Sequence, residues 1–417
     1  MIADEPNLLE AVRQKFHNVG SCPVGGNRIF FENAGGALTL KSVVEASNEF
    51  AAFPDNQGRK NVSSEYAVSK IEEGKNNIRL LFNARSGVVF LGESGTELIF
   101  RIIRDAIIST ETGGNVVGST LEHPATRSAA IRWAKVLNKN YVSIPHNAVS
   151  GSVDAKDYEK FINKETRVAT IIHSSPVTGM TSDVAEISES IRQISPNCFI
   201  IVDGIQHASH GIIDVNAYNI DAYIISPYKV FSRHGYGIGW LSDRLSKVDH
   251  DHLIDGPTDT WELGTRDAGA YATFSEVVNY FDWLGLQHSS ENEPRERIKV
   301  AYSAIKKHEK KLIDLMIKGT DEVVGLKDLP GINAIGGFEN EKRAGLISIY
   351  SNNVDSAEIV DQLRLKGIRV HIRKDDHYSG TILRPLELES CVRVSICHYN
   401  SKEEVLKFLS VMKEICS

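Results

Sequence analysis

The stretch from Phe199 to Trp240 constrains the fold of this chain more than any other. It contains two short apolar runs, 199–202 and 222–225, and each run ends in polar residues. This pattern is typical of parallel strands that are buried on both faces and present polar side chains at their carboxyl ends. Ligands bind at that edge of an open α/β sheet. We therefore expect an α/β sheet with a binding site there, closed by a glycine-rich turn at 235–240.

Polar side chains follow both apolar runs. Asp203 and Gln206 come after the first run, and Ser226 and Lys229 come after the second. Burial lowers the pKa of a lysine amine, which can then form a Schiff base with an aldehyde cofactor. Pyridoxal phosphate needs such a lysine and a carboxylate that faces its pyridine nitrogen. On these residues alone, a structural ion pair between Asp203 and Lys229 is an equal alternative.

Composition excludes several classes of protein. The chain has 417 residues, of which 41% are hydrophobic and 24% charged, as is usual for a globular protein of two or three domains. Its net charge is −7 and no basic run stands out, which argues against nucleic acid or an anionic membrane as a partner. No apolar stretch is long enough to span a bilayer, and residues 1–5 do not read as a signal peptide.

Cysteine usage bears on the compartment. The five cysteines are scattered and form no CxxC pair; they are Cys22, Cys198, Cys391, Cys397 and Cys416. This fits a reducing cytoplasm and argues against a disulfide framework or a zinc site. The segment 249–252 alternates Asp and His, but four adjacent ligand-type residues cannot all face one ion, so no metal is expected.

Strands and helices alternate from about residue 29 to 240, which predicts a mostly parallel sheet with helices on both faces. Beyond a long helical tract at 292–318 the pattern changes to a smaller α+β domain. Its strands are expected at 346–350, 368–372 and 392–396. We expect an N-terminal segment that packs with the small domain, a large cofactor-binding domain and a small C-terminal domain. Their ranges are 1–28, 29–285 and 286–417.

The turn Ser94-Gly95-Thr96 lies between a predicted strand and a predicted helix. Free backbone N–H groups and the helix dipole make such a turn an anion site, although simple N-capping is the plainer explanation. The turn matches neither a Walker loop, nor GxGxxG, nor GxSxG, which disfavours a nucleotide-binding protein and a hydrolase.

Two more residues carry possible chemistry. His123 follows a strand and could stack on a flat cofactor or shuttle protons, although a lone His before Pro is more often an ordinary loop residue. The helix after it is expected at 128–137. Arg393 lies inside an apolar strand and could clamp a carboxylate, the alternative being a structural salt bridge.

Taken together, these motifs resemble the class V aminotransferase family of fold type I pyridoxal phosphate enzymes, most of all its cysteine-desulfurase-like branch. The resemblance runs from about residue 29 to the end and rests on seven segments in the family's order. The segments are 33–36, 94–97, 122–125, 203–206, 226–229, 262–265 and 393–400.

The resemblance implies the roles of the site residues. Lys229 would be the Schiff-base lysine and the acid/base, Asp203 would hold the pyridinium, and His123 would stack on the ring. The implied cofactor-binding residues are Gly95, Thr96, His123, Asp203, Gln206, Ser226, Tyr228, Lys229 and Thr265. Thr265 would reach the phosphate of the neighbouring protomer, so the family implies a homodimer with shared active sites.

The resemblance also implies how substrate binds. Arg393 would hold the α-carboxylate of an amino acid, with Asn33 and Tyr378 as further contacts. Two positions depart from many relatives: Tyr228 stands where they have His, and Pro176 where they have Asn. Both changes are compatible with cofactor binding and leave the route of protons open.

The absence of a cysteine from one segment limits the reactions that the resemblance allows. Desulfurases of this branch use a cysteine on a mobile loop, and the corresponding segment here, 371–380, contains none. Cys391 and Cys397 bracket the Arg393 strand, where packing is their expected role. We expect His377 or Tyr378 to cover the substrate instead. A β-eliminating C–S lyase without a protein persulfide is favoured, with an aminotransferase or epimerase as alternatives, and a non-catalytic binding protein of the same fold as a third.

Overall fold

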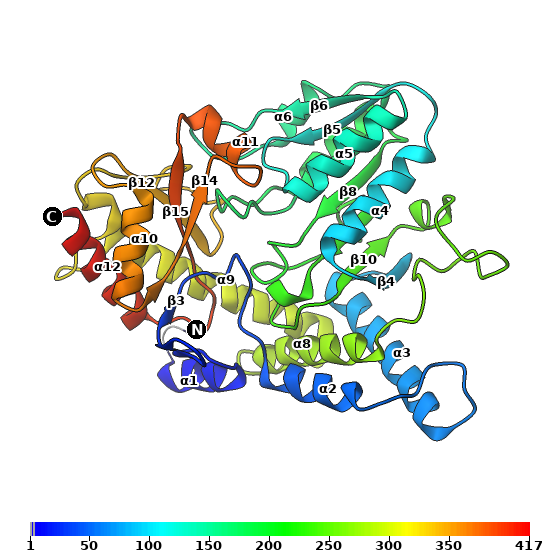
Figure 1. Cartoon of the computed structure of the whole chain (residues 1–417), viewed down its shortest axis with the longest axis horizontal. Coiled ribbons are helices and arrows are strands. Elements are labelled where there is room, and N and C mark those ends of the chain that lie inside the picture. The colour runs from blue at the N-terminus through cyan, green and yellow to red at the C-terminus, as the bar shows by residue number, and fades with distance from the viewer. Residues whose placement is uncertain (1, 3–4) are drawn as a thin grey trace.

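The structure is a computed structural model that describes residue 2 and residues 5–417. Its centre is a seven-stranded sheet in the order β4-β10-β9-β8-β7-β5-β6 (Figure 1). The strands are β4 (Val88–Gly92), β5 (Asn115–Ser119), β6 (Asn140–Ile144), β7 (Thr166–Ile172), β8 (Phe199–Asp203), β9 (Ala222–Ile225) and β10 (Gly237–Leu241). Only β10 runs antiparallel to its neighbours in this sheet, which confirms the prediction of a mostly parallel sheet.

Helices bury both faces of this sheet. Along β8, Phe199 and Ile201 join the apolar cluster under α4 and α5, whereas Ile200 and Val202 join the cluster of α3, α7 and α8. The period of two along a strand explains this division. The helices of this part are α2 (Lys41–Ala51), α3 (Val62–Phe82), α4 (Gly95–Ile108), α5 (Pro124–Val136), α6 (Ala155–Glu159), α7 (Val184–Ile194) and α8 (Ala268–Leu286).

The prediction of a turn at 235–240 is wrong for most of its length, because residues Gly237–Leu241 form β10. The glycines serve packing rather than a turn. A Cβ at Gly237 would collide with the backbone of Ser94, and one at Gly239 would lie 2.9 Å from Phe90 Cε1. Glycine at 237 lets the start of α4 lie directly against the sheet, and glycine at 239 leaves room for the Phe90 ring of β4.

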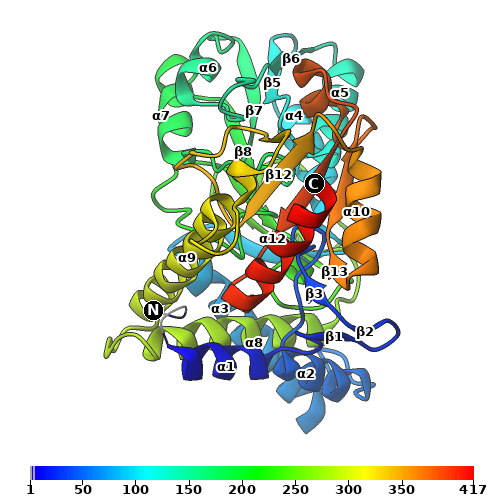
Figure 2. The same cartoon turned by 90° about the vertical axis from the view of Figure 1, so that its left-hand side faces the viewer.

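The C-terminal part is built on a four-stranded antiparallel sheet in the order β11-β12-β15-β14. Its strands are β11 (Ile332–Ala334), β12 (Leu346–Ser351), β14 (His371–Lys374) and β15 (Ser390–Ser395). Figure 2 shows the helices of this part beside the sheet, and their apolar side chains pack on its outer face. They are α9 (Pro294–Lys318), α10 (Ser356–Leu365) and α12 (Lys402–Cys416), with a short α11 (Gly380–Leu383) at one end.

The N-terminal segment contacts both parts of the chain. The Phe16 ring lies edge-on to Phe231 and Tyr280 of the larger part, at 5.4 and 5.3 Å, and other contacts are made with the smaller part. From α1 (Pro6–Lys15), Arg13 Nη1 donates to Tyr399 O at 2.7 Å and lies 3.1 Å from Glu404 Oε1. A hairpin of β1 (Ser21–Cys22) and β2 (Gly26–Asn27) leads to β3 (Ile29–Phe30), which pairs with β13 (Ile368–Arg369). The strand expected at 368–372 is therefore two strands, β13 and β14, with different partners.

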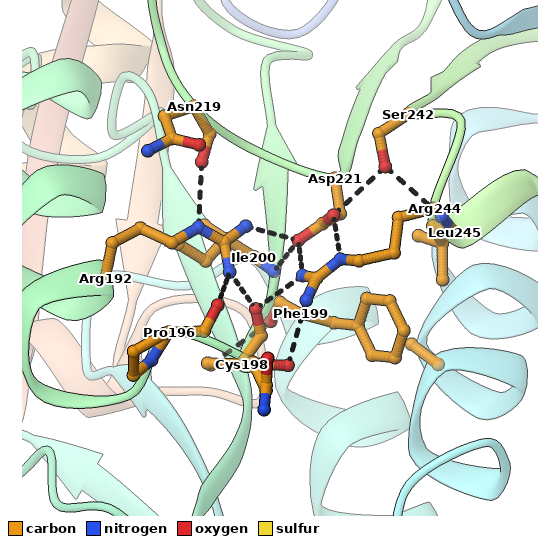
Figure 3. A network of polar contacts seen from close by, with 12 residues as sticks. Arg192, Pro196, Cys198, Phe199, Ile200, Asn219, Asp221, Ser242, Arg244 and Leu245 are labelled. Atoms are coloured by element: carbon orange, nitrogen blue, oxygen red, sulfur yellow. Dashed lines mark hydrogen bonds and ion pairs between the residues drawn. The ribbon is translucent and has the colours of Figure 1, made fainter.

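An ion-pair network ties the sheet together at the amino ends of its strands (Figure 3). The Asp221 carboxylate pairs with Arg192 Nη2 at 2.7 Å and Arg244 Nη2 at 2.6 Å, and it accepts a hydrogen bond from Ile200 N at 2.9 Å. Because Asp221 precedes β9 and Ile200 lies early in β8, the network holds these strands at the edge opposite their carboxyl ends. Among the described residues, no helix has the length and apolar character needed to cross a bilayer.

Candidate active site

The carboxyl ends of β8 and β9 meet at one cavity. The two strands are parallel neighbours, so Asp203 at the end of β8 and Lys229 just after β9 lie at the same edge. Lys229 Nζ donates a hydrogen bond to Gln206 Oε1 at 3.2 Å. The cavity is lined by Thr96, His123, Ile172, Ser174, Pro176, Asp203, Ile205, Gln206, Ser226, Tyr228 and Lys229. Seven of the residues expected from the sequence thus line one cavity.

Lys229 is buried, and this decides the state of its amine. Burial, and next the positive charge of Arg393, lower the pKa of Lys229 to about 7 from the ordinary 10.5, while Asp203 opposes the shift. A buried cation is costly in a medium of low dielectric, so the neutral amine is favoured. Near neutral pH a large fraction of Lys229 is therefore uncharged and nucleophilic.

Asp203 has neutral partners and space for a cation. Its carboxylate accepts hydrogen bonds from Ile205 N at 3.0 Å and from Thr126 Oγ1 at 3.2 Å. Burial raises the pKa of the Asp203 carboxyl, and no ion pair with it occurs in the described part of the chain. A positively charged N–H, such as a protonated pyridine nitrogen, is the partner that such a carboxylate lacks.

His123 presents a neutral ring to the cavity. It caps α5, and its Nδ1 accepts a hydrogen bond from Ala125 N at 3.2 Å, which leaves the proton on Nε2. Burial, then the charge of Lys229, lower the pKa of His123 to about 3. The helix expected at 128–137 in fact begins at Pro124, because proline is favoured in the first turn of a helix. An uncharged flat ring at this place suits stacking on an aromatic cofactor.

The start of α4 offers free donors. Ser94 acts as the N-cap, because its Oγ accepts a hydrogen bond from Glu97 N at 3.1 Å. The N-capping considered for the Ser94-Gly95-Thr96 turn is therefore present. In the described part of the chain, the backbone N–H groups of Gly95 and Thr96 and the hydroxyls of Thr96 and Ser226 have no hydrogen-bond partner. A Cβ at Gly95 would collide with Ser226 Oγ, so glycine keeps this turn close to β9. Such a set of donors at a helix N-terminus suits a phosphate.

Arg393, on the small sheet, lies beside this cavity and contacts Pro176 of its lining. Its side chain is buried, and Nη1 donates to Pro176 O at 3.1 Å while Nε is buried without a partner. The alternative of a structural salt bridge finds no support, since no carboxylate of the described residues lies within 4.0 Å of this guanidinium. Burial lowers the pKa of Arg393 to about 10, which leaves it charged at neutral pH.

The remaining expected residues differ in their positions. The Tyr378 ring meets the His123 ring edge-on at 5.8 Å, and Tyr228 stacks on His234 at 4.3 Å. Asn33 is engaged inside the protein, because its Nδ2 donates to Ser395 O at 2.8 Å and its Oδ1 accepts from the Tyr399 hydroxyl.

Thr265 does not reach this cavity. It lines a separate pocket with Phe50, Phe53 and Arg266. Within one chain, the structure therefore leaves Thr265 apart from the other expected residues.

Sequence reasoning missed two residues of the site. Thr126 holds Asp203 from the first turn of α5, and a helix start at Pro124 was the signal that could have placed it. Ser174 lines the cavity and its Oγ lies 3.1 Å from His207 Nδ1. It is the second residue after β7, so its place just beyond a buried strand was the signal available.

The fold and the cavity together define a fold type I pyridoxal phosphate-dependent enzyme, because amine, carboxylate and helix-end donors match the aldehyde, ring nitrogen and phosphate of that cofactor. The comparison with known families agrees. The chain belongs to the class-V aminotransferase family, whose sequence model matches residues 29–408. This membership sets aside the alternative of a non-catalytic binding protein.

Individual relatives span nearly the whole chain. The cysteine desulfurase-like protein ustD of Aspergillus flavus is 25% identical over 426 residues, which cover 98% of this chain and 90% of that protein. The aminotransferase-like protein FGM3 of Gibberella zeae is 24% identical, with 93% and 94% covered. A solved cysteine desulfurase from Thermococcus onnurineus superposes with a TM-score of 0.82 at 23% identity, with 98% of both chains covered. Escherichia coli cysteine desulfurase CsdA gives 0.79 at 20%, with 97% and 98% covered.

Proposed function

We propose that this chain binds pyridoxal phosphate at Lys229 and breaks a bond at Cα or Cβ of an amino acid. The favoured reaction is β-elimination of a sulfur-bearing group, a C–S lyase reaction, without a persulfide on the protein. The observation that carries the proposal is the position of the buried Lys229 amine, which lines the cavity 3.2 Å from Gln206 Oε1 and lies at the same sheet edge as Asp203. Beside this cavity lies the Arg393 guanidinium, which has no carboxylate of the described residues within 4.0 Å.

Each residue has a part that follows from its surroundings. When bound, the cofactor withdraws electrons from the substrate α-carbon. Asp203 keeps the ring nitrogen protonated, His123 covers the ring, and the Gly95–Thr96 turn with Ser226 holds the phosphate. Arg393 fixes the α-carboxylate and thereby orients the α-carbon. The Lys229 amine, with its pKa near 7, can accept the α-proton and return it, since an acid/base works best near its own pKa.

The cysteines support a reaction without a protein persulfide. Segment 371–380 contains no cysteine, and Cys391 and Cys397 are both buried. Burial raises the pKa of Cys391 to about 11 and that of Cys397 well above its ordinary value. A thiol nucleophile acts as the thiolate, so neither residue is suited to attack a substrate sulfur.

Transamination, or epimerisation, is the second candidate. The name of the relative FGM3, an aminotransferase-like protein, favours transamination. Loss of the α-proton is shared by all three reactions, so the cavity described above serves each of them.

The assembly proposed is a homodimer with shared active sites. Thr265 lies away from the cavity of its own chain, in a pocket with Phe53 and Arg266. A partner chain would bring Thr265 to the phosphate site, as the family resemblance implies.

The free cysteines support a cytoplasmic location.

Product analysis over a panel of amino acids tests the proposed reaction. Pyruvate, with the sulfur-bearing group of a cysteine derivative released as a thiol or sulfide, is the expected product of β-elimination. Alanine would instead indicate sulfur transfer to an acceptor thiol, and an oxo acid formed together with the pyridoxamine form of the cofactor would favour transamination. The Cys391→Ser and Cys397→Ser variants should keep their turnover. Loss of turnover in one of them, with folding and cofactor retained and persulfide trapped on that cysteine in the parent, would overturn the persulfide-free mechanism.

A further inference from the structure

A second arginine shares the face of the small sheet that carries Arg393. In the pairing of β14 with β15, His371 lies opposite Arg393 and Arg373 lies opposite Cys391. Opposed residues and residues two apart point to the same side of a sheet, so Arg373 and Arg393 are diagonal neighbours on one face. The Ser348 hydroxyl, opposite Arg393 on β12, donates to Val177 O, so this face packs against the loop after β7.

Arg373 is held in place but keeps free donors. Its Nε donates to Ser379 Oγ at 2.8 Å, and its guanidinium lies over the Tyr378 ring, 5.4 Å from the centroid. The Tyr378 ring in turn meets His123 at 5.8 Å. In the part of the chain that the structure describes, neither terminal nitrogen of Arg373 has a hydrogen-bond partner, and no carboxylate lies within 4.0 Å. These contacts hold the Arg373 guanidinium, which has no anionic partner, over the Tyr378 ring, and that ring contacts His123 of the cavity lining.

Asp376, whose negative charge acts on Arg373, forms no ion pair with it. Asp376 uses Oδ1 to accept hydrogen bonds from Tyr378 N at 2.8 Å and Ser379 N at 3.1 Å, which form the exposed turn after β14. The positive charge of Arg373 is felt inside the site, where it lowers the pKa of Lys229, His123 and Arg393. Arg393 and Arg373 therefore both lie near the cavity without a carboxylate of the described residues within 4.0 Å.

In the proposed function, the anionic groups of cofactor and substrate provide a partner for Arg393 but not for Arg373. Asp203 is assigned to the cofactor ring, and the phosphate to the uncharged donors at the start of α4. The α-carboxylate of a substrate pairs with Arg393. A half-buried guanidinium without an anionic partner is unfavourable, and a substrate that brings a second anion would supply one.

From this geometry we infer that Arg373 binds an anionic group on the side chain of the substrate. The substrate class would then be an α-amino acid with a carboxylate, sulfinate or sulfonate at its side-chain end. This inference rests on the proposed function, because it assigns the second anion to the amino acid of that reaction.

Equilibrium binding to the full-length cofactor-bound enzyme tests the inference. Kd is measured by calorimetry, and by the change in the cofactor absorption spectrum, for two pairs: aspartate with the near-isosteric asparagine, and cysteine sulfinate with the smaller, neutral cysteine. The anionic member of at least one pair should bind about tenfold tighter or more. A preference in the first pair identifies a carboxylate, and one in the second identifies a sulfur oxyanion.

Substitutions assign the preference to Arg373. R373Q should abolish it while the Kd of the neutral amino acids and the cofactor spectrum stay within about twofold, and R373K should restore part of it. The matched control is K374Q, because Lys374 is exposed and points to the other side of β14. It should keep the parent preference.

The outcomes separate this inference from the proposed function. A parent enzyme that binds neutral and anionic amino acids equally, or an R373Q variant that folds and keeps the preference, would overturn the role of Arg373 alone. A protein that binds no cofactor, or whose spectrum responds to no amino acid, would overturn the proposed function itself.

Discussion

At the scale of single residues, the chemistry depends on how burial changes charge. Lys229, Asp203 and His123 all lie in the same cavity, yet burial raises the pKa of the acid and lowers that of the two bases. Each shift favours the uncharged form. Arg393 keeps its charge because its ordinary pKa is so high. The site therefore combines a neutral amine with a permanent cation for a carboxylate.

The pKa of Lys229 makes a prediction about pH. The rate at which cofactor-free enzyme takes up pyridoxal phosphate should increase with pH through a midpoint near 7, because the neutral amine is the reactive form. The same shift should make the cofactor-free fold more stable as pH rises from about 7 toward 10.5, since the unfolded chain then binds a proton that the folded chain does not. Stopped-flow absorbance measures the uptake. A midpoint near the ordinary lysine value would contradict the account.

The assignment of Arg393 to the substrate α-carboxylate leads to a second prediction, on amino-acid binding. Arg393→Ala should weaken amino-acid binding by roughly 2–4 kcal/mol, because a charge-assisted contact to the α-carboxylate is lost. The cofactor spectrum should barely change. Substrate titrations check this, with Arg364→Ala on the exposed side of α10 as a control that should leave Kd unchanged. An unaltered Kd in the Arg393 variant would mean that the residue is only structural.

At the scale of elements, the ends of the buried strands could be predicted from the sequence. Close packing between helices and strands far apart in the chain could not. The polar residues after β8 and β9 could be placed because a buried parallel strand has a characteristic apolar run. β10 was taken for a turn because Gly237 and Gly239 weaken a strand pattern, and their function is contact with residues far away in the chain. The start of α5 was placed four residues late for a related reason, since the His-Pro pair that begins it also reads as a loop.

The Asp221 network makes a prediction for the far edge of the sheet. Asp221→Asn should lower the free energy of unfolding by about 3 kcal/mol, because it leaves two arginines without their buried carboxylate. Urea denaturation checks this, with the exposed Asp361→Asn as the control, expected within about 0.5 kcal/mol of the parent. Activity per folded molecule should be unchanged, since the network lies at the edge opposite the cavity. A variant as stable as the parent would contradict this role.

At the scale of the whole molecule, the order of the motifs predicted the family and the fold. The contacts between segments far apart in the sequence could be found only in the structure. Asn33 illustrates the limit, since its amide is occupied by Ser395 and Tyr399 from the far end of the chain. Arg373 and Arg393 are neighbours only through the pairing of β14 with β15. The domain division near residue 285 and the place of Thr265 in a dimer stay predictions.

The most direct test of the central claim is chemical. Enzyme incubated with pyridoxal phosphate is reduced with borohydride and digested, and the modified peptide is identified by mass spectrometry. The account predicts a yellow protein whose label is found on Lys229, and a Lys229→Ala variant that is not labelled although it folds. A colourless protein that takes up no cofactor, or a label on a lysine outside the cavity, would contradict it.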